Sequence, residues 1–429
     1  MRASFLAGGG GQIGERARPS VAVESRAPMS DPLDPRRERI VVLALTSGAF
    51  AMALNTQVMA ALMPFLEPEL VPDKAAKGQL VAAAGFAGAV GALLLGPWVD
   101  RFGRRMPLGL GLAVFAVASF LHLFATDATT LLALRALSGF SVGVAYTGAS
   151  AAIADLVPYS RRGAAMGIFT AGIFLATPIG LPLANLWATA GHWRWIFVAQ
   201  GGFGIAALVV CMRVLPAGLG ASGRGTSLVK LLRRPMVVPL LLAIALATGS
   251  FFAFVQFAGE WLHDVRIVPR EQQAWMWISL GLCSAVGSIV LGRYVDRVGK
   301  RTFVLASTAA LAFLLGLMMR VGDIGMLLAV GLPMTFVAAA RTAAFQTLSS
   351  EIVPPAMRGA LMGLRGAAVQ GGQGLFLAIG GGVYADHGFN TFLWLTVGGV
   401  AASYLLIRLF VHEERGEYPA PVELSNPRK

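Results

Sequence analysis

The sequence predicts an all-α polytopic membrane protein in which twelve transmembrane helices form two parallel six-helix halves. Only 13% of its 429 residues are charged and 56% are hydrophobic, whereas soluble domains carry about 25% charged residues. Charge-poor runs of about 20 residues, each long enough to cross a hydrocarbon core as a helix, recur along the whole chain. Signature residues of the first half return in the second at a constant offset. Lipid offers backbone groups no hydrogen-bond partners, so the spans must be helical.

The apolar runs define the elements in order. We expect spans at 39–62, 77–99, 106–125, 130–156, 163–187, 192–215, 236–261, 272–295, 302–320, 324–350, 359–384 and 388–411. They divide the chain into a disordered cytoplasmic segment at 1–38, an N-terminal bundle at 39–215, a cytoplasmic linker at 216–235, a C-terminal bundle at 236–411 and a cytoplasmic tail at 412–429.

The net charge of +13 comes from basic residues whose distribution along the chain indicates the membrane topology. Most Lys and Arg residues fall in segments on the N-terminal side of the membrane, and six lie on the opposite side: Lys74, Lys77, Arg194, Arg266, Arg270 and Arg320. The positive-inside rule therefore predicts cytoplasmic termini and anionic lipid as a neighbour. Because the bases are scattered over short loops, they form no nucleic-acid footprint.

A repeat relates the two halves. The string "GPWVDRFGRR" at 96–105 returns as "GRYVDRVGKR" at 292–301, an offset of 196. Gly96, Asp100, Arg101, Gly103, Arg104 and Arg105 correspond to Gly292, Asp296, Arg297, Gly299, Lys300 and Arg301, and Asp155 and Arg162 correspond to Glu351 and Arg358. An even number of spans separates the copies, so both halves have the same orientation.

The repeated string has a physical role of its own. Asp100 ends a span, where it can accept hydrogen bonds or meet the positive N-terminus of a neighbouring helix. Gly103 allows a tight turn, and the arginines can pair with acids on facing loops or with the anionic leaflet. An ordinary basic loop would explain the arginines alone, but not the Asp and Gly residues at matched spacing.

Over residues 39–411 the chain resembles the major facilitator superfamily, whose loop motif G-x-x-x-D-R-x-G-R-R the first string matches at every specified position. The resemblance implies a transporter that rocks two helical halves around a central site. It also implies that the residues of both strings, with Asp155, Arg162, Glu351 and Arg358, form a latch for one of the alternating conformations.

Arg135 is a candidate for coupling. It lies about 10 Å inside the outer boundary at 1.5 Å per residue, and an arginine inside the membrane is costly enough to suggest function. Residues 131–139 resemble the family's helix 4 motif L-x-x-x-R-x-x-x-G, whose arginine is associated with proton coupling; Ser138 replaces the preferred Gln. The alternative is an arginine that snorkels to the outer interface.

Residues 139–143 also match G-x-S-x-G, but a hydrolase elbow needs a strand-to-helix turn with a His and an acid nearby. The span provides neither, so we expect no enzyme. Pro178, Gly180 and Pro182 predict a kink in the span at 163–187. They resemble the pattern of arabinose-efflux-like permeases and drug–proton antiporters, although a generic kinked membrane helix would also explain the prolines.

Few acids lie in the spans. Asn55 stands nine residues before Pro64, where proton-coupled exporters of this family often have an acid, and it cannot titrate. Glu260 is the deepest acid, close to the outer interface, and is a coupling candidate or a plain interfacial residue. The five histidines all lie near span ends, so we expect no buried histidine relay.

Arg341 and Arg365 break the repeat, because Ala145 and Phe169 occupy the matching positions. A buried guanidinium requires partners. We therefore expect these arginines to coordinate an anionic or strongly hydrogen-bonding substrate, or Arg365 to pair with Asp100 or Glu351 across the gate. The remaining candidates for the substrate cavity are Asn55, Gln57, Tyr146, Gln256, Gln346, Gln370 and Gln373.

The expected function is secondary transport of a small organic solute across a bacterial inner membrane, as proton-coupled efflux. An organic-anion exchanger or uptake symporter that uses the arginines is one alternative, and a non-transporting membrane sensor is another. No G-x-x-x-x-G-K-[ST] loop occurs, so an ion gradient rather than ATP should supply the energy. We expect no cofactor, no metal, no disulfide between Cys211 and Cys283, and a monomer.

Overall fold

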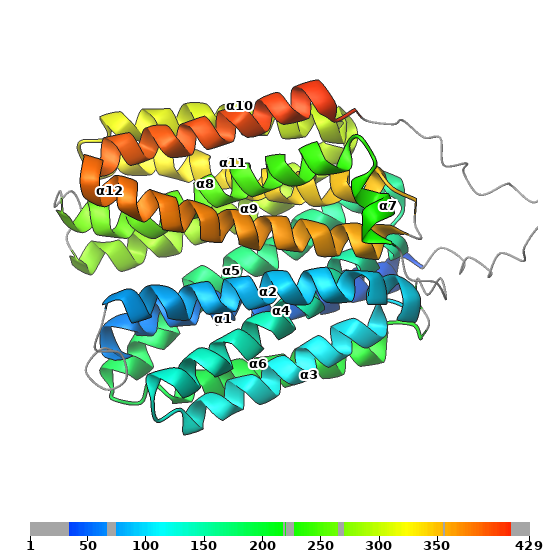
Figure 1. The fold of residues 1–429 in the computed structure, drawn as a ribbon, viewed down its shortest axis with the longest axis horizontal. Helices are drawn as coiled ribbons and strands as arrows, with labels where there is room; N and C mark the ends of the chain where they lie inside the picture. Colours follow the sequence, from blue (N-terminus) through cyan, green and yellow to red (C-terminus); the bar gives the residue numbers. More distant parts are fainter. Residues whose placement is uncertain are drawn as a thin grey trace, which may run out of the picture.

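The chain folds into long antiparallel helices joined by short turns (Figure 1). The computed structural model describes residues 34–66, 74–217, 219, 227–264, 270–354 and 357–412. The long helices are α1 (Pro35–Leu66), α2 (Lys74–Phe102), α3 (Arg105–Leu121), α4 (Ala128–Leu156), α5 (Arg162–Thr189), α6 (Trp195–Val214), α8 (Val237–Asp264), α9 (Arg270–Val298), α10 (Lys300–Leu317), α11 (Ile324–Glu351) and α12 (Arg358–Phe410). A short helix, α7 (Leu228–Leu232), lies in the predicted linker.

The helices form two groups, α1–α6 and α8–α12, which we call the N-terminal and C-terminal halves (Figure 1). The second group also has six rods, because α12 contains a break at Gly388, whose φ is 79°. There the chain folds back on itself, between the last two predicted spans (Figure 1). Among the described residues, ten helices are long and apolar enough to cross a membrane by length and composition. The predicted fold class is confirmed.

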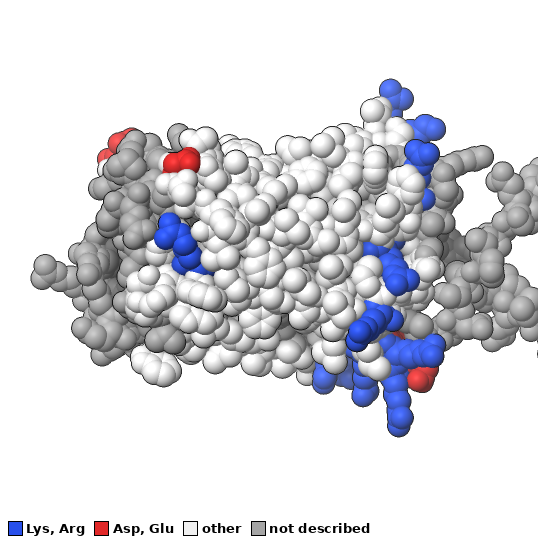
Figure 2. Space-filling view, turned by 90° about the horizontal axis from the view of Figure 1, so that it is seen from below, with Lys and Arg blue, Asp and Glu red and all other residues white. Residues whose placement is uncertain are grey.

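The two chain ends lie at the same end of the bundle: α1 begins and α12 ends there, beside α7 (Figure 1). We call this end the terminal face. Figure 2 shows Lys and Arg side chains gathered at the terminal face and an uncharged band across the middle of this side of the molecule. Such a band between two more polar ends is what a bilayer requires.

Helix caps repeat with the same offset as the sequence. Asp127 begins α4 by accepting a hydrogen bond from Thr130 N at 2.8 Å, and Asp323 begins α11 by accepting one from Met326 N at 2.9 Å. Each cap satisfies one of the free N–H groups of a first helical turn. The hydrogen bonds from Thr130 also hold the pKa of the exposed Asp127 carboxyl below its ordinary value.

Helix contacts repeat as well. A Cβ atom added to Gly91 of α2 would lie 2.5 Å from the Phe140 carbonyl oxygen of α4, and one added to Gly287 of α9 would lie 2.5 Å from that of Phe336 in α11. These pairs are again 196 residues apart. Small residues let membrane helices pack backbone to backbone, so the repeat extends from sequence to packing.

Candidate functional site

At the terminal face each half contains the same internal ion pair. Arg104 Nε lies 2.9 Å from Asp155 Oδ2 in the N-terminal half, and Lys300 Nζ lies 3.1 Å from Glu351 Oε1 in the C-terminal half. Both basic side chains are almost fully buried. A buried cation needs such a partner, so each pair fixes the loop of its half against the end of α4 or α11.

The same two acids also reach across to the opposite half. Arg358 Nη1 of α12 lies 3.1 Å from Asp155 Oδ1, and Arg162 Nη1 of α5 lies 3.6 Å from Glu351 Oε1. The pairs are reciprocal, because each acid of one half accepts the arginine of the other at matching positions of the repeat. Each acid therefore holds its own half together and joins it to the other.

Asp296 adds a third type of link between the halves. Its carboxylate oxygens accept hydrogen bonds from Gly163 N at 3.0 Å and Ala164 N at 3.1 Å, at the start of α5. A carboxylate at a helix N-terminus meets both free N–H donors and the positive end of the helix dipole. A Cβ atom at Gly163 would lie 2.8 Å from Asp296 Oδ1, so only glycine permits this approach.

The other residues of the repeated strings support these contacts. Gly103 and Gly299 have φ angles of 85° and 97°, which favour glycine. Arg105 Nη2 donates to the Met212 carbonyl oxygen at 2.5 Å, and Arg301 Nη2 donates to that of Arg408 at 2.8 Å. The remaining members are Arg101 and Arg297, which are exposed, Gly292, which packs against α5, and Gly96 and Asp100 of α2, whose surroundings the structure does not describe.

A narrow crevice with a cavity volume of about 50 Å³, part of it open to the surroundings, lies between the halves in the middle of the bundle. The N-terminal half contributes Asn55 from α1 and Arg135 from α4, and the C-terminal half contributes Gln370 and Gln373 from α12. Four predicted cavity or coupling residues are therefore brought together. Phe86 and Phe252 supply apolar walls, so the crevice combines apolar surface with a few polar groups, as ligand sites do.

Arg135 is the only charged residue among the described residues that line this crevice. Its side chain is 1% exposed, and it does not extend to the outer interface. Nη1 donates to the Asn55 carbonyl oxygen at 2.9 Å and to Asn55 Oδ1 at 2.7 Å, while Nε has no partner among the described residues. Within the described part of the chain no carboxylate lies within ion-pair distance of Arg135, so the crevice carries a positive charge.

A polar chain extends from Asn55 into the N-terminal half. Gln200 Nε2 lies 3.5 Å from Asn55 Oδ1 and 3.0 Å from Ser119 Oγ. Gln200 and Ser119 were not predicted as site residues, because single polar residues inside apolar spans gave no distinguishing signal. This chain holds the Asn55 amide in the orientation in which its oxygen faces Arg135.

His122 is buried, although the five histidines lie near predicted span ends and no buried histidine relay was expected. The residue follows α3 directly, near a predicted span end, yet its side chain is fully buried and stacks on Phe197 with 4.3 Å between ring centroids. Nδ1 lies 2.7 Å from the Ala118 carbonyl oxygen and so carries the proton, whereas Nε2 has no partner among the described residues. Sequence position alone could not reveal that α6 covers this helix end.

The remaining cavity candidates lie elsewhere. Gln346 Nε2 bonds to Tyr146 Oη at 2.7 Å and to Thr170 Oγ1 at 3.3 Å, which joins the halves nearer the terminal face. Gln57 donates to Thr177 Oγ1, and Gln256 is half-buried. None of these residues lines the crevice, and the Glu260 side chain lies outside the described residues.

Arg341 and Arg365 are each 1% exposed but do not line the crevice. Arg341 Nη2 donates to the Ala247 carbonyl oxygen of α8 at 3.2 Å, and its Nε and Nη1 have no partner among the described residues. Arg365 Nε also has no partner among the described residues. Glu351 binds Arg162 and Lys300 instead of Arg365. We expected both arginines to bind a substrate together with Gln346, Gln370 and Gln373, but of these five residues only Gln370 and Gln373 line the crevice.

The predicted kink residues lie inside α5, which continues from Arg162 to Thr189. Pro178 packs against Gly281 of α9, where an added Cβ atom would lie 2.7 Å from Pro178 Cδ. Gly180 faces Leu54 of α1, and Pro182 is half-buried. The prolines and glycines of α5 thus serve its contacts with both neighbouring helices.

Comparison with known proteins gives consistent results. The sequence profile of the Major Facilitator Superfamily matches residues 45–267 and 261–428. The inner membrane transport protein YdhP of Escherichia coli K12 is 26% identical over 257 residues, which cover 60% of this chain and 66% of the relative. A probable sugar efflux transporter of Helicobacter acinonychis is 24% identical over 265 residues, which cover 61% of this chain and 67% of the relative. These alignments span about two thirds of each relative.

Two solved structures share the fold. The human organic anion transporter MFSD10 superposes with a TM-score of 0.71 at 19% identity and covers 87% of this chain and 100% of its own. The proton:xylose symporter XylE, bound to 6-bromo-6-deoxy-D-glucose, superposes with a TM-score of 0.73 at 17% identity and covers 89% and 97%. At these identities the likeness extends to the fold alone.

Proposed function

We propose that this chain, which belongs to the Major Facilitator Superfamily and is a membrane transporter, exports a small organic solute across a bacterial inner membrane in exchange for protons. The crevice between the halves is the observation that carries this proposal. Polar groups from both halves converge there, at the depth where rocking of two bundles would expose a site to each side in turn. The relative named as a probable sugar efflux transporter supports export.

The links at the terminal face support alternating access. With its carboxylate and guanidinium groups paired across the halves, that face is held together while the crevice lies beyond it. By the distribution of basic residues we assign the terminal face to the cytoplasm. The structure then corresponds to the conformation that faces outward, and export requires these links to open and re-form in each cycle.

A second candidate, transport of an organic anion, is favoured by one specific observation. Arg135 brings a positive charge to the crevice, and no carboxylate among the described residues neutralises it. An anionic solute would supply the missing partner. Gln370 and Gln373 could orient such a solute from the opposite wall.

Transport by the purified protein in proteoliposomes would test the proposal. With an acidic interior and a pH dye outside, an inside-out exporter should release protons when its substrate is added outside. The substrate would first be selected by a thermal-shift screen of drugs, sugars and organic anions at two pH values. Counterflow of a labelled anion that is independent of the pH gradient would instead support the second candidate and contradict proton exchange.

A further inference from the structure

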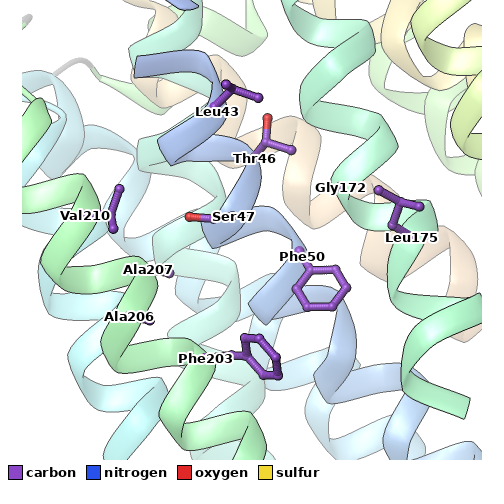
Figure 3. A pocket seen from close by; sticks show the side chains of 10 residues that line it. All are labelled: Leu43, Thr46, Ser47, Phe50, Gly172, Leu175, Phe203, Ala206, Ala207 and Val210. Atoms are coloured by element: carbon purple, nitrogen blue, oxygen red, sulfur yellow. The ribbon is translucent and has the colours of Figure 1, made fainter. Parts of the chain in front are cut away.

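A second hollow of the described surface does not lie between the halves. It is a groove with a volume of about 390 Å³ between α1, α5 and α6, and it is open to the surroundings. Figure 3 shows Phe50 and Phe203 at one end and Leu43 and Val210 toward the other. Its exposed walls are apolar, as is expected of a surface that faces the hydrocarbon core.

The groove exists because its floor is built from small residues. Gly172 lies against Thr46, and Ala206 and Ala207 line the α6 wall. The two hydroxyl groups in the groove are already satisfied, since Thr46 Oγ1 donates to the Val42 carbonyl oxygen and Ser47 Oγ to that of Ala44, each at 2.7 Å. Neither hydroxyl proton is therefore free to be donated to a polar guest, and the groove, with its mostly apolar lining, suits a hydrocarbon chain.

Two arginines stand at the end of the groove nearest the terminal face. Arg39 precedes Leu43 by one helical turn on the same side of α1, and Arg213 follows Val210 by three residues on α6. Both are exposed, and neither forms a hydrogen bond or ion pair with a described residue. The acid beside them, Glu38, is already paired with Arg161 at 2.8 Å, so the charge at this end is positive.

The dimensions agree with those of one membrane leaflet. From Arg39 to Phe50 is about 16 Å along α1, and from Arg213 to Phe203 about 15 Å along α6, at 1.5 Å per residue. One leaflet of a hydrocarbon core of about 30 Å is about 15 Å deep. The two helices thus place a cationic site at the leaflet surface and an apolar groove of matching depth beneath it.

We propose that this groove binds one anionic phospholipid, with its phosphate between Arg39 and Arg213 and an acyl chain along α1 and α6 to Phe50 and Phe203. Guanidinium groups hold phosphate oxygens by charge-assisted hydrogen bonds. The groove does not select among acyl chains by type or by length. The site goes beyond the proposed transport activity, so it is tested without a transport substrate.

The test is native mass spectrometry of the detergent-purified full chain titrated with palmitoyl-oleoyl phosphatidylglycerol, or with phosphatidylcholine that has the same chains. Wild-type protein should bind the first phosphatidylglycerol molecule at least about 5-fold more tightly than phosphatidylcholine, since each arginine near an anionic headgroup adds about that factor. The double substitution Arg39→Gln with Arg213→Gln should abolish this preference. Arg293→Gln, a matched loss of an exposed arginine on α9, should retain it.

Filling the groove tests the acyl chain separately. Ala206→Phe should weaken binding of both lipids, and Ser47→Phe on the α1 wall repeats the test if the first variant does not fold. Ala401→Phe, at an exposed alanine of α12, is the control. Unchanged affinity in the arginine double variant or in both filling variants would overturn the proposal. So would displacement of phosphatidylglycerol by an equal concentration of inorganic phosphate, which would indicate a free-anion site.

Discussion

Arg358 of α12 places Nη1 3.1 Å from Asp155 Oδ1 of α4, which joins two residues that lie 203 positions apart in the chain. In the corresponding contact the roles of the halves are exchanged: Arg162 of the N-terminal half pairs with Glu351 of the C-terminal half. Each acid also holds a basic side chain of its own half, Arg104 or Lys300. The halves are therefore joined by a network with approximate two-fold symmetry, whose failure should open the terminal face.

A double-mutant cycle on Asp155 and Arg358 measures this link. Asp155→Asn and Arg358→Gln should each raise the population that is open at the terminal face, and the double variant should open it no further than the stronger single variant. Contacting charges couple by about 0.5–3 kcal/mol. Distances between spin labels at Ser160 and Arg293, with Cys211 and Cys283 replaced by serine, report the populations. Strictly additive effects would contradict the contact.

Replacement of Asp296 tests the helix cap. Asp296→Ala removes both hydrogen bonds to the start of α5, and Asp296→Asn removes the charge but keeps one acceptor oxygen. We expect both to open the terminal face, alanine more than asparagine, with a cost of about 0.5–2 kcal/mol for the loss of a cap. The same pair of labels measures the change. Asp386→Asn, at an exposed position, is the control and should have no effect.

Asn55→Asp would place a carboxylate where the Asn55 amide oxygen now lies 2.7 Å from Arg135 Nη1. We expect a higher melting temperature, because the buried guanidinium gains a charged partner. If the crevice binds an anion, its affinity for that anion should fall at least about 10-fold, because the new carboxylate neutralises the charge of Arg135. A tenfold loss of affinity corresponds to about 1.4 kcal/mol of binding free energy. Thermal unfolding and binding of the selected substrate measure the two effects.

Asn55→Leu is the matched control for this site. It removes the Oδ1 acceptor, so one N–H of Arg135 Nη1 loses its partner at a cost of about 1–3 kcal/mol, while the bond from Nη1 to the backbone carbonyl oxygen of this position remains. The melting temperature should therefore fall. A leucine variant as stable as the wild type would show that the Arg135–Asn55 contact contributes nothing to the fold.

Gly143→Ala tests the contact between α2 and α4. The added Cβ atom would lie 2.0 Å from the Gly88 carbonyl oxygen, and both atoms belong to rigid helices. Overpacking of this type costs about 1–3 kcal/mol, so we expect a lower melting temperature. Gly398→Ala in α12 has no atom within 4 Å of the new Cβ and should be neutral or stabilise by about 0.5–1 kcal/mol. Equal melting temperatures for the two variants would contradict the close approach.

The fold was predictable because its signals are local. A run of apolar residues predicts a span wherever it occurs. The offset of 196 is visible in the sequence, and the structure repeats it in the caps of α4 and α11. Asp296, Gly299 and Lys300 could be selected for the same reason, since they stand in one short repeated string. Their partners were less visible: nothing in the sequence states that Asp296 would meet Gly163.

The candidate site was predicted only in part. Asn55, Arg135, Gln370 and Gln373 were candidates because they are polar residues in apolar helices, and they converge on the crevice. Arg341 and Arg365 satisfied the same criterion and lie elsewhere. Polarity within a span is a property of one residue, whereas the direction of a side chain depends on the rotation of its helix against its neighbours. His122 shows the converse, because a residue at a helix end is buried when another helix covers it.

The sequence by itself determined that this protein is a helical membrane protein built from two copies of a six-helix unit, since composition, hydropathy and repetition are read along one chain. Only the tertiary structure decided which charges meet across the halves, which arginine lines the crevice and where an apolar groove opens on the surface. These depend on distances between side chains that are up to about 200 residues apart, as the bond between Tyr146 and Gln346 illustrates. Helix packing fixes such distances, and no local pattern contains them.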